Sequence, residues 1–233
     1  MIVDTHTHTP RFKGKIPEGE RGLNTVWRPD RGVSWPYNWA EYIEAMEPVD
    51  KAIVFNIARE MGQHEVNDAT AEFVRAYPDK LIGFLSVHPH DPNCLEEMER
   101  CVSDLGLCGI KLGPNYQNFD PLGEDAFRVY ARAQELGLPI VFHTGTSPVQ
   151  MADLDYAHPR HFDRVAIAFP DLKMVLAHMA HPWQATTIAV IRKHPNVYAD
   201  LSGGTAIRRA TRSISINKIS GRRIICNACV IIT

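Results

Sequence analysis

Three polar residues near the start of the chain have the spacing of a metal-binding strand. The segment VDTHTHTP, residues 3–10, places Asp4, His6 and His8 two positions apart. Residues two apart in an extended strand project from the same side, so these side chains are predicted to point in one direction. Two imidazoles on one strand form half of a site for a divalent metal ion. The alternative is a polar strand end with two surface histidines, and the position of the other histidines decides between them.

Further candidates stand at the ends of later apolar runs. They are Lys111 in GIKL, His143 in VFHTGTS, His178 and His181 in LAHMAHPW, and Asp200 in YADLSGG. A catalytic metal keeps about three protein ligands and one open position. A nearby histidine transfers protons close to neutral pH. If these run ends meet in space, the residues have the composition of a metal-dependent catalytic site.

The elements that must position these residues alternate regularly. Short runs rich in Val, Ile, Leu and Phe are typical of strands buried on both faces. They cover residues 1–5, 51–57, 81–87, 108–112, 138–144, 172–178 and 196–202. Helical segments between them cover residues 37–47, 64–77, 94–105, 124–136, 159–169 and 182–194. This alternation predicts an α/β fold of parallel strands, in which a closed barrel brings the carboxyl ends of the strands to one face.

The composition is that of one sizeable domain. The chain has 233 residues, of which 45% are hydrophobic, and an α/β barrel of ~200–250 residues is an ordinary size. A net charge of −2 gives no reason to expect a nucleic-acid or membrane partner, and no apolar run approaches the length of a membrane span. No charged apolar leader is evident, and five scattered cysteines indicate reduced thiols, so a cytoplasmic location is expected. The expected partner is a small-molecule substrate, and a homo-oligomer is left open.

Taken together and in order, five motifs resemble the metal-dependent amidohydrolase superfamily over about residues 1–204. The motifs are VDTHTHTP, GIKLGPNYQNFDP, LPIVFHTGTS, HPRHFDRVAIAFPDLKMVLAHMAHPW and NVYADLSG. They match its amidohydrolase-related branch, which includes hydrolases and non-oxidative decarboxylases acting on aminocarboxymuconate semialdehyde and resorcylate. The resemblance implies a distorted TIM (β/α)8-type barrel with one divalent metal ion. This ion is expected to be zinc, with manganese as the alternative. It implies that His6, His8 and His143 are metal ligands and that His178 is the catalytic histidine.

Four other residues each have more than one possible role. Lys111 is predicted to bind a carboxylate of the substrate; carbamylation as a metal bridge, as in some relatives in the wider superfamily, is the alternative. His181 is predicted to contact the substrate or to serve the start of a helix. Asp200 is predicted either to hydrogen-bond a metal ligand or stabilise the structure, or to replace the missing carboxylate. Asp4 is predicted to orient the turn or a ligand histidine.

The remaining histidines have simpler interpretations. His64 and His194 are predicted on helix surfaces. His88 and His90 follow the third strand, where they either line the rim of the pocket or shape a turn.

The end of the chain departs from the family's pattern. Residues 201–233 contain six basic residues and no acidic one. The family takes a further metal ligand and general base from an Asp after the eighth strand, and no acidic residue follows Asp200. The sequence therefore predicts a barrel domain over 1–204, an atypical basic tail over 205–233 and a barrel without an evident eighth strand.

These observations support one leading function and two alternatives. The leading prediction is a metal-dependent hydrolase that cleaves a C–N or C–O bond of a small molecule with a metal-activated water. The first alternative is a non-oxidative decarboxylase of an aromatic or unsaturated carboxylic acid that uses the same metal. The second alternative is a non-catalytic, truncated barrel that lacks the eighth-strand Asp.

Overall fold

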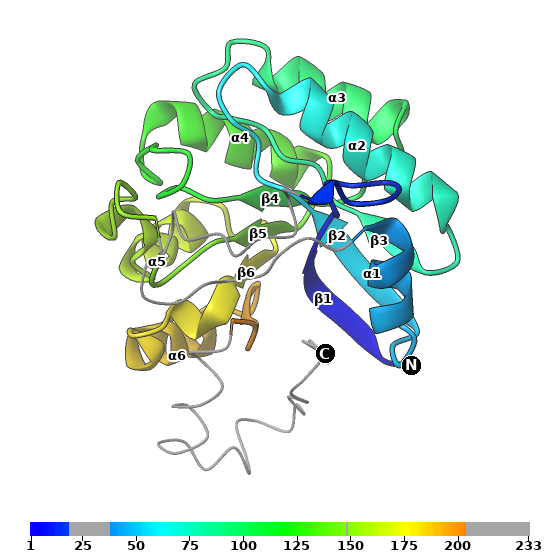
Figure 1. Cartoon of the computed structure of the whole chain (residues 1–233). Helices are drawn as coiled ribbons and strands as arrows, with labels where there is room; N and C mark the ends of the chain where they lie inside the picture. The colour runs from blue at the N-terminus through cyan, green and yellow to red at the C-terminus, as the bar shows by residue number, and fades with distance from the viewer. Residues whose placement is uncertain (19–37, 148, 204–233) are drawn as a thin grey trace.

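The computed structural model describes residues 1–18, 38–147 and 149–203 (Figure 1). Its strands are β1 (Val3–His8), β2 (Lys51–Phe55), β3 (Leu81–Gly83), β4 (Ile110–Leu112), β5 (Ile140–Phe142), β6 (Met174–Leu176) and β7 (Val197–Ala199). Its α-helices are α1 (Trp39–Ala45), α2 (Gln63–Ala76), α3 (Cys94–Ser103), α4 (Glu124–Glu135), α5 (Arg160–Ala168) and α6 (Gln184–Lys193). Every strand and helix expected from the sequence is present. Two short 3₁₀ helices, η2 (Asp155–Ala157) and η3 (Ala177–Ala180), were not predicted.

The strands lie side by side in chain order, and every pair is parallel. One group is β1-β2-β3 and the other is β4-β5-β6-β7. A parallel bridge between Leu85 and Ile110 joins the groups, and the backbone N–H of Lys111 donates to the carbonyl of Leu85 at 2.7 Å. The predicted α/β barrel architecture is confirmed. The predicted basic tail at 205–233, where an eighth strand was not evident, lies outside the described residues.

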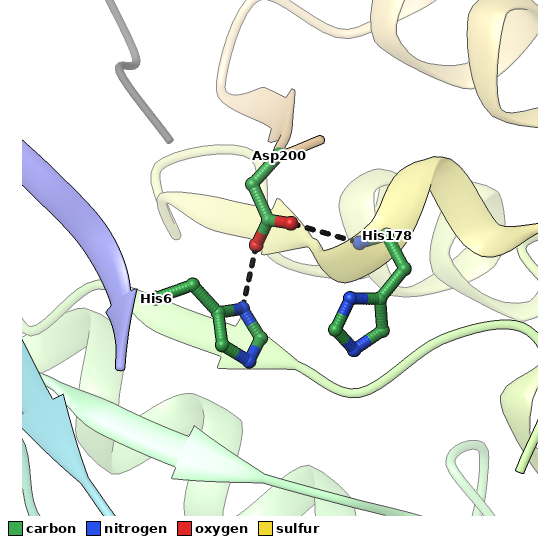
Figure 2. Close-up of side chains that lie close together, drawn as sticks. All are labelled: His6, His178 and Asp200. Carbon is green, nitrogen blue, oxygen red and sulfur yellow. Dashed lines mark hydrogen bonds and ion pairs between the residues drawn. The ribbon is translucent and has the colours of Figure 1, made fainter. Parts of the chain in front are cut away.

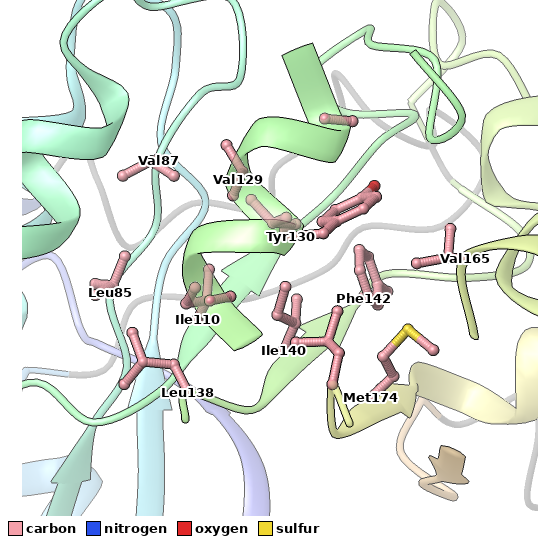
Figure 3. Packing of buried hydrophobic residues seen from close by; sticks show 14 of the residues in the cluster. Leu85, Val87, Ile110, Val129, Tyr130, Leu138, Ile140, Phe142, Val165 and Met174 are labelled. Atoms are coloured by element: carbon pink, nitrogen blue, oxygen red, sulfur yellow. The ribbon is translucent and has the colours of Figure 1, made fainter. Parts of the chain in front are cut away.

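Helices cover the outer face of the sheet, and the core lies between the two layers (Figures 1 and 3). Strands β4 and β5 are buried at every residue, as expected for strands covered on both faces. Helix α4 turns Val129, Tyr130 and Ala133 inward, and each of these is fully buried. Figure 3 shows Tyr130 beside Phe142 of β5, and their ring centroids are 5.5 Å apart. This packing holds the carboxyl ends of the central strands in fixed positions.

The strands after β1 are shorter than the sequence predicted, and β5 ends directly before His143. The segment 172–178 was expected to be extended, but β6 ends at Leu176 and His178 lies in η3. Strand β1 behaves in the opposite way and continues to His8, with a break in its register against β2 between Asp4 and Thr7. At this break the Asp4 carboxylate accepts the backbone N–H of His6 at 3.1 Å, in agreement with the predicted orienting role.

None of the helices in the described part of the chain combines the length and apolar character that crossing a lipid bilayer requires.

Candidate active site

Four histidines from three strand ends form a continuous row of imidazoles. His8 and His6 come from β1, His178 from η3 after β6, and His143 from the residue after β5. The ring centroids of His8 and His6 are 5.7 Å apart, those of His6 and His178 are 4.8 Å apart, and those of His178 and His143 are 5.0 Å apart. The structure therefore brings together the three predicted metal ligands and the predicted catalytic histidine.

The carboxylate of Asp200 holds the centre of this row. Asp200 is the first residue after β7, and its Oδ2 accepts a hydrogen bond from His6 Nδ1 at 2.8 Å. Its Oδ1 accepts the backbone N–H of His178 at 2.9 Å (Figure 2). β1 and β7 are the outermost strands among those the structure describes, so this buried carboxylate joins the two edges of the sheet across the site.

The donor set fits a divalent metal ion. Because His6 Nδ1 donates to a carboxylate, its proton is on Nδ1 and its Nε2 keeps a free lone pair. Figure 2 shows the rings of His6 and His178 side by side, each with its far nitrogen turned away from Asp200. Metal-binding atoms of His6, His178 and Asp200 lie within 4.8 Å of one another. This group shares only His6 with the predicted set of His6, His8 and His143, so the exact ligand set remains a prediction.

Burial keeps the imidazoles in the neutral form that metal binding and base catalysis require. It lowers the pKa of His178 to about 4, with a further contribution from His6. Burial and neighbouring positive groups lower the pKa of His8 and of His143 well below the ordinary value. Asp200 behaves oppositely: burial would raise its pKa, but contacts with His6 and His178 hold that pKa well below its usual range. A charged carboxylate therefore faces neutral imidazoles at neutral pH.

Lys111 of β4 brings a cation to the same place. Its side chain is 1% exposed, and its Nζ has no hydrogen-bond partner in the described part of the chain. The Nζ lies 4.9 Å from the centre of the Phe55 ring. The rings of His6 and His8 also contact Phe55, at 5.0 and 5.2 Å. Burial lowers the pKa of Lys111 to about 7, although the charge of Asp200 acts against the shift. A buried amine without a partner is costly unless a ligand supplies one.

His181 is held by the start of helix α6. Its Nδ1 lies 2.6 Å from Nε2 of Gln184, the first residue of that helix, and its carbonyl accepts the backbone N–H of Thr146 at 2.8 Å. These contacts favour the predicted helix-start role, while substrate contact by His181 stays a prediction.

The backbone around His178 is strained. His178, Met179 and Ala180 have φ values of 61°, 51° and 47°, in the left-handed region that residues other than glycine rarely adopt. The N–H of Met179 donates to the carbonyl of Asp200 at 2.8 Å, which fixes the turn. A Cβ on Gly145 would come within 2.5 Å of the His181 carbonyl oxygen, so only glycine lets the β5 loop approach so closely. Strain of this kind persists where surrounding contacts over-determine the backbone, and it is frequent at functional sites.

Two residues of the site were not predicted. Phe55 ends β2 and packs against His6, His8 and Lys111. Ser202 contacts both Asp200 and His178. For Ser202 a signal existed in the sequence, because Ser202 and Asp200 are spaced two apart at the end of a strand, as are the histidines of β1.

One prediction about the outlying histidines was wrong. His194 was expected on a helix surface, but it is buried at the end of α6, and its Nε2 lies 2.7 Å from Asp163 Oδ1 on α5. His88 is also buried, and its Nε2 contacts the Gln117 carbonyl at 2.8 Å, in favour of the turn role.

Relatives of this chain carry several chemistries on one fold. A dihydroorotase of Helicobacter pylori is 27% identical over 164 residues, which cover 67% of this chain and 47% of that protein. The chain thus spans about half the length of the curated relatives it matches. The structure of 4-oxalomesaconate hydratase from Rhodopseudomonas palustris is similar, with a TM-score of 0.62, 20% identity and coverage of 93% of this chain and 79% of that one.

A third similar protein is a decarboxylase with a bound metal. The structure of 5-carboxyvanillate decarboxylase from Novosphingobium aromaticivorans contains manganese and 4-hydroxy-3-methoxy-5-nitrobenzoic acid. Its TM-score is 0.51 at 21% identity, and the match covers 66% of this chain and 53% of that one. The sequence model of the amidohydrolase family matches residues 3–219. The row of histidines at the strand ends and this match over most of the sequence place the chain in the amidohydrolase family.

Proposed function

We propose that this chain carries the site of a metal-dependent hydrolase that cleaves a C–N or C–O bond of a small anionic molecule. One observation carries the proposal: four neutral imidazoles, that of His143 buried and the others partly buried, converge beside a buried lysine that has no hydrogen-bond partner among the described residues. The imidazoles suit a divalent metal ion, and the lysine suits a carboxylate or another oxyanion of the substrate. The match to a dihydroorotase over two thirds of this chain supports the hydrolytic reading.

His6, His8 and His143 are the residues proposed to hold the metal ion, zinc or manganese, with Asp200 supporting His6 from behind. When bound, such an ion polarises a substrate oxygen and lowers the pKa of a water molecule. The proposal requires neutral ring nitrogens, and burial supplies them at neutral pH.

In this proposal His178 transfers protons, and the positive charge of Lys111 binds the substrate. With a pKa of about 4, His178 is unprotonated at neutral pH, and it takes a proton from the attacking water. The water oxygen forms a bond to the substrate carbon as the C–N or C–O bond breaks, and His178 returns the proton to the leaving nitrogen or oxygen. Lys111 binds the substrate's anionic group, which removes the cost of leaving this amine without a partner.

The pKa of Lys111, about 7, favours decarboxylation as the second candidate. An ammonium with this pKa is a competent general acid near neutral pH. In this reaction the bond between the carboxyl carbon and its neighbour breaks, carbon dioxide leaves, and the remaining carbon takes a proton from Lys111. The similarity to a decarboxylase of known structure shows a shared fold, and only the products can separate the two reactions.

Metal content of the purified protein tests the common requirement of both candidates. We expect about one zinc or manganese ion per chain, because a catalytic site holds one ion with roughly three ligands. His143→Ala should lose the ion. His90→Ala is the matched control, because His90 is an exposed histidine whose ring lies beside that of His88, and it is not among the proposed metal ligands. A wild-type protein that stays free of metal after addition of zinc or manganese would contradict the proposal.

Product analysis separates the candidates. The metal-loaded protein is incubated with cyclic amides and lactones that carry a carboxylate, and with aromatic and unsaturated carboxylic acids. Ring opening supports the hydrolase, and release of carbon dioxide supports the decarboxylase. Lys111→Met should raise KM for a carboxylate substrate about 10- to 100-fold, as expected for loss of a hydrogen bond between charged groups. If the metal-loaded protein forms neither product, both candidates are overturned.

A further inference from the structure

Two residues that follow β7, Ser202 and Gly203, lie against the ring of His178. Ser202 Oγ lies 2.7 Å from His178 Nδ1 and also contacts Asp200 Oδ1. We propose that Ser202 is a positioning residue that fixes His178 as the Nδ1–H tautomer and thereby presents an unprotonated Nε2 to the site. The tautomer follows from the hydrogen bonds alone, and only the use of Nε2 as a base rests on the proposed function.

Counting protons assigns the direction of each hydrogen bond. Asp200 Oδ1 accepts the backbone N–H of His178 and that of Ser202, both at 2.9 Å, so it acts only as an acceptor. Ser202 Oγ carries a single proton, and that proton must face Asp200 Oδ1, because two acceptor oxygens in contact would repel each other. The lone pairs of Ser202 Oγ then face His178 Nδ1. Nδ1 must therefore be the donor, and the proton of the neutral imidazole is on this nitrogen.

Gly203 gives an independent indication that this turn is shaped around His178. Gly203 has a φ of +76°, a backbone conformation that favours glycine. A Cβ at this position would lie 3.0 Å from His178 Nδ1 and 3.4 Å from its Cγ. The ring therefore rests against the backbone of residue 203 while its Nδ1 donates to the side chain of residue 202. Orientation and tautomer are fixed by adjacent residues of one short segment.

The arrangement makes Asp200 the common acceptor of two histidines. His6 Nδ1 donates to Oδ2 directly, and His178 Nδ1 donates to Oδ1 through the hydroxyl of Ser202. One carboxylate thus sets the same tautomer in both rings, and both Nε2 atoms keep their lone pairs for the site. Without the Ser202 hydroxyl, the His178 ring would keep its backbone contact with residue 202 but lose the link through that hydroxyl to Asp200, so its proton would be freer to move to Nε2.

The test is the tautomer of His178 in the metal-free protein, read from two-bond ¹H–¹⁵N correlations of ¹⁵N-labelled histidine. We expect the Nδ1–H form in the wild type and in Ser202→Thr, which keeps the hydroxyl. Ser202→Ala should show partial or complete conversion to the Nε2–H form. Ser103→Ala is the matched control, because Ser103 Oγ also donates to a carboxylate, that of Asp104, on the exposed end of α3. An Nε2–H form in the wild type, or an unchanged Nδ1–H form in Ser202→Ala, would overturn the proposal.

A second measurement links the tautomer to turnover. In the metal-loaded enzyme, Ser202→Ala should lower kcat about 10- to 100-fold, the range typical of residues that support a site histidine, with KM nearly unchanged. Ser202→Thr should restore most of this loss. The wild-type spectrum alone remains decisive if Ser202→Ala does not fold. A protein with the Nδ1–H form and no turnover on any substrate would overturn the proposed function and leave the assignment of the tautomer intact.

Discussion

Among the described residues, the buried carboxylates of Glu97 and Asp200 both contact histidines, and they differ in whether the polar groups beside them have hydrogen-bond partners. Glu97 of α3 accepts hydrogen bonds from Arg100 Nε at 2.8 Å, Asn67 Nδ2 at 2.8 Å and Cys101 Sγ at 3.2 Å. His64 Nδ1 lies 2.5 Å from Glu97 Oε2, the oxygen that also accepts from Arg100 Nε. Every contact of Glu97 ends on protein, and its partners come from α2 and α3, which it ties together.

Asp200 is also buried, but the amine of Lys111 beside it has no hydrogen-bond partner among the described residues. His6 and His178 turn their far nitrogens away from the carboxylate, and Lys111 Nζ has no hydrogen-bond partner among the described residues. Buried polar groups are almost always paired in folded proteins, so the amine of Lys111, which has no hydrogen-bond partner among the described residues, needs an explanation. A saturated network of hydrogen bonds stabilises the fold, whereas a network with open positions prepares a site for a ligand. The two clusters should therefore respond differently to mutation.

The largest effect on stability is expected for Glu97→Gln. The change leaves the guanidinium of Arg100 and the thiol of Cys101 without their charged acceptor, and it should lower the free energy of unfolding by about 3 kcal/mol. Urea denaturation measures this difference. Metal bound per folded chain should stay the same, since the cluster lies outside the site. If Glu97→Gln instead lost its metal and kept its stability, the contrast between a structural role for Glu97 and a site role for Asp200 would be wrong.

The same variant gives a test by pH. Burial alone would raise the pKa of Glu97, but hydrogen bonds from Arg100 and Asn67 lower it from 4.5 to about 2. A carboxylate whose pKa is lower in the folded state contributes stability above the unfolded pKa and loses it as the pH falls through the folded value. The stability difference between wild type and Glu97→Gln should therefore be constant above pH 5 and shrink between about pH 4.5 and pH 2.

The next effect is expected for Asp200→Asn, which changes the site more than the fold. The variant weakens the hydrogen bond that orients His6, and metal affinity should fall about 10- to 100-fold, or about 1.4 to 2.7 kcal/mol. Isothermal titration with zinc measures the affinity. Asp163→Asn is the matched control, because Asp163 also bonds a histidine, His194, but lies between α5 and α6 away from the site. Equal losses of affinity in both variants would show that the contact to His6 has no special role.

A smaller effect is expected for Ser86→Ala, which removes a link between the two clusters. Asn67, which donates to Glu97, also accepts the backbone N–H of Ser86, and Ser86 Oγ donates to the carbonyl of Lys111 at 2.7 Å. The same hydroxyl accepts the N–H of Ala58 at 2.9 Å. Losing it should lower the free energy of unfolding by about 1 to 2 kcal/mol, because a buried N–H is left unpaired. Denaturation and zinc titration together check that stability falls while metal affinity does not.

The fold could be predicted from the sequence because its signals are local and repeated. Apolar runs such as 138–144 alternate with helical stripes such as that of α4, and parallel pairing in chain order follows from this alternation. The meeting of His6, His143 and His178 follows in turn, since the carboxyl ends of parallel strands share one face. These expectations needed only the period of the pattern and the position of each histidine in its strand.

Other features of the site depend on contacts that no local pattern encodes. That Asp200 bonds His6 across the two edge strands is a contact between residues 194 positions apart. The burial of His194 and its bond to Asp163 depend on how α5 packs on α6. The left-handed turn at His178, Met179 and Ala180 contains no glycine that could have signalled it. Tertiary contacts impose these details on sequences that would favour other local conformations.

The smallest effect in this series is expected for the ion pair between α5 and α6. Lys193 Nζ lies 2.7 Å from Asp163 Oδ1, and both side chains are partly exposed. An exposed ion pair contributes about 0 to 1 kcal/mol, because water screens the charges and the long side chain loses freedom. Lys193→Met should therefore lower the free energy of unfolding by less than about 1 kcal/mol, and salt should reduce even this difference. Denaturation of wild type and variant at low and high salt measures it. If the free energy of unfolding fell as much as in Glu97→Gln, exposed and buried carboxylate contacts would contribute equally to stability. The contrast between this ion pair and the buried carboxylates of Glu97 and Asp200 would then be wrong.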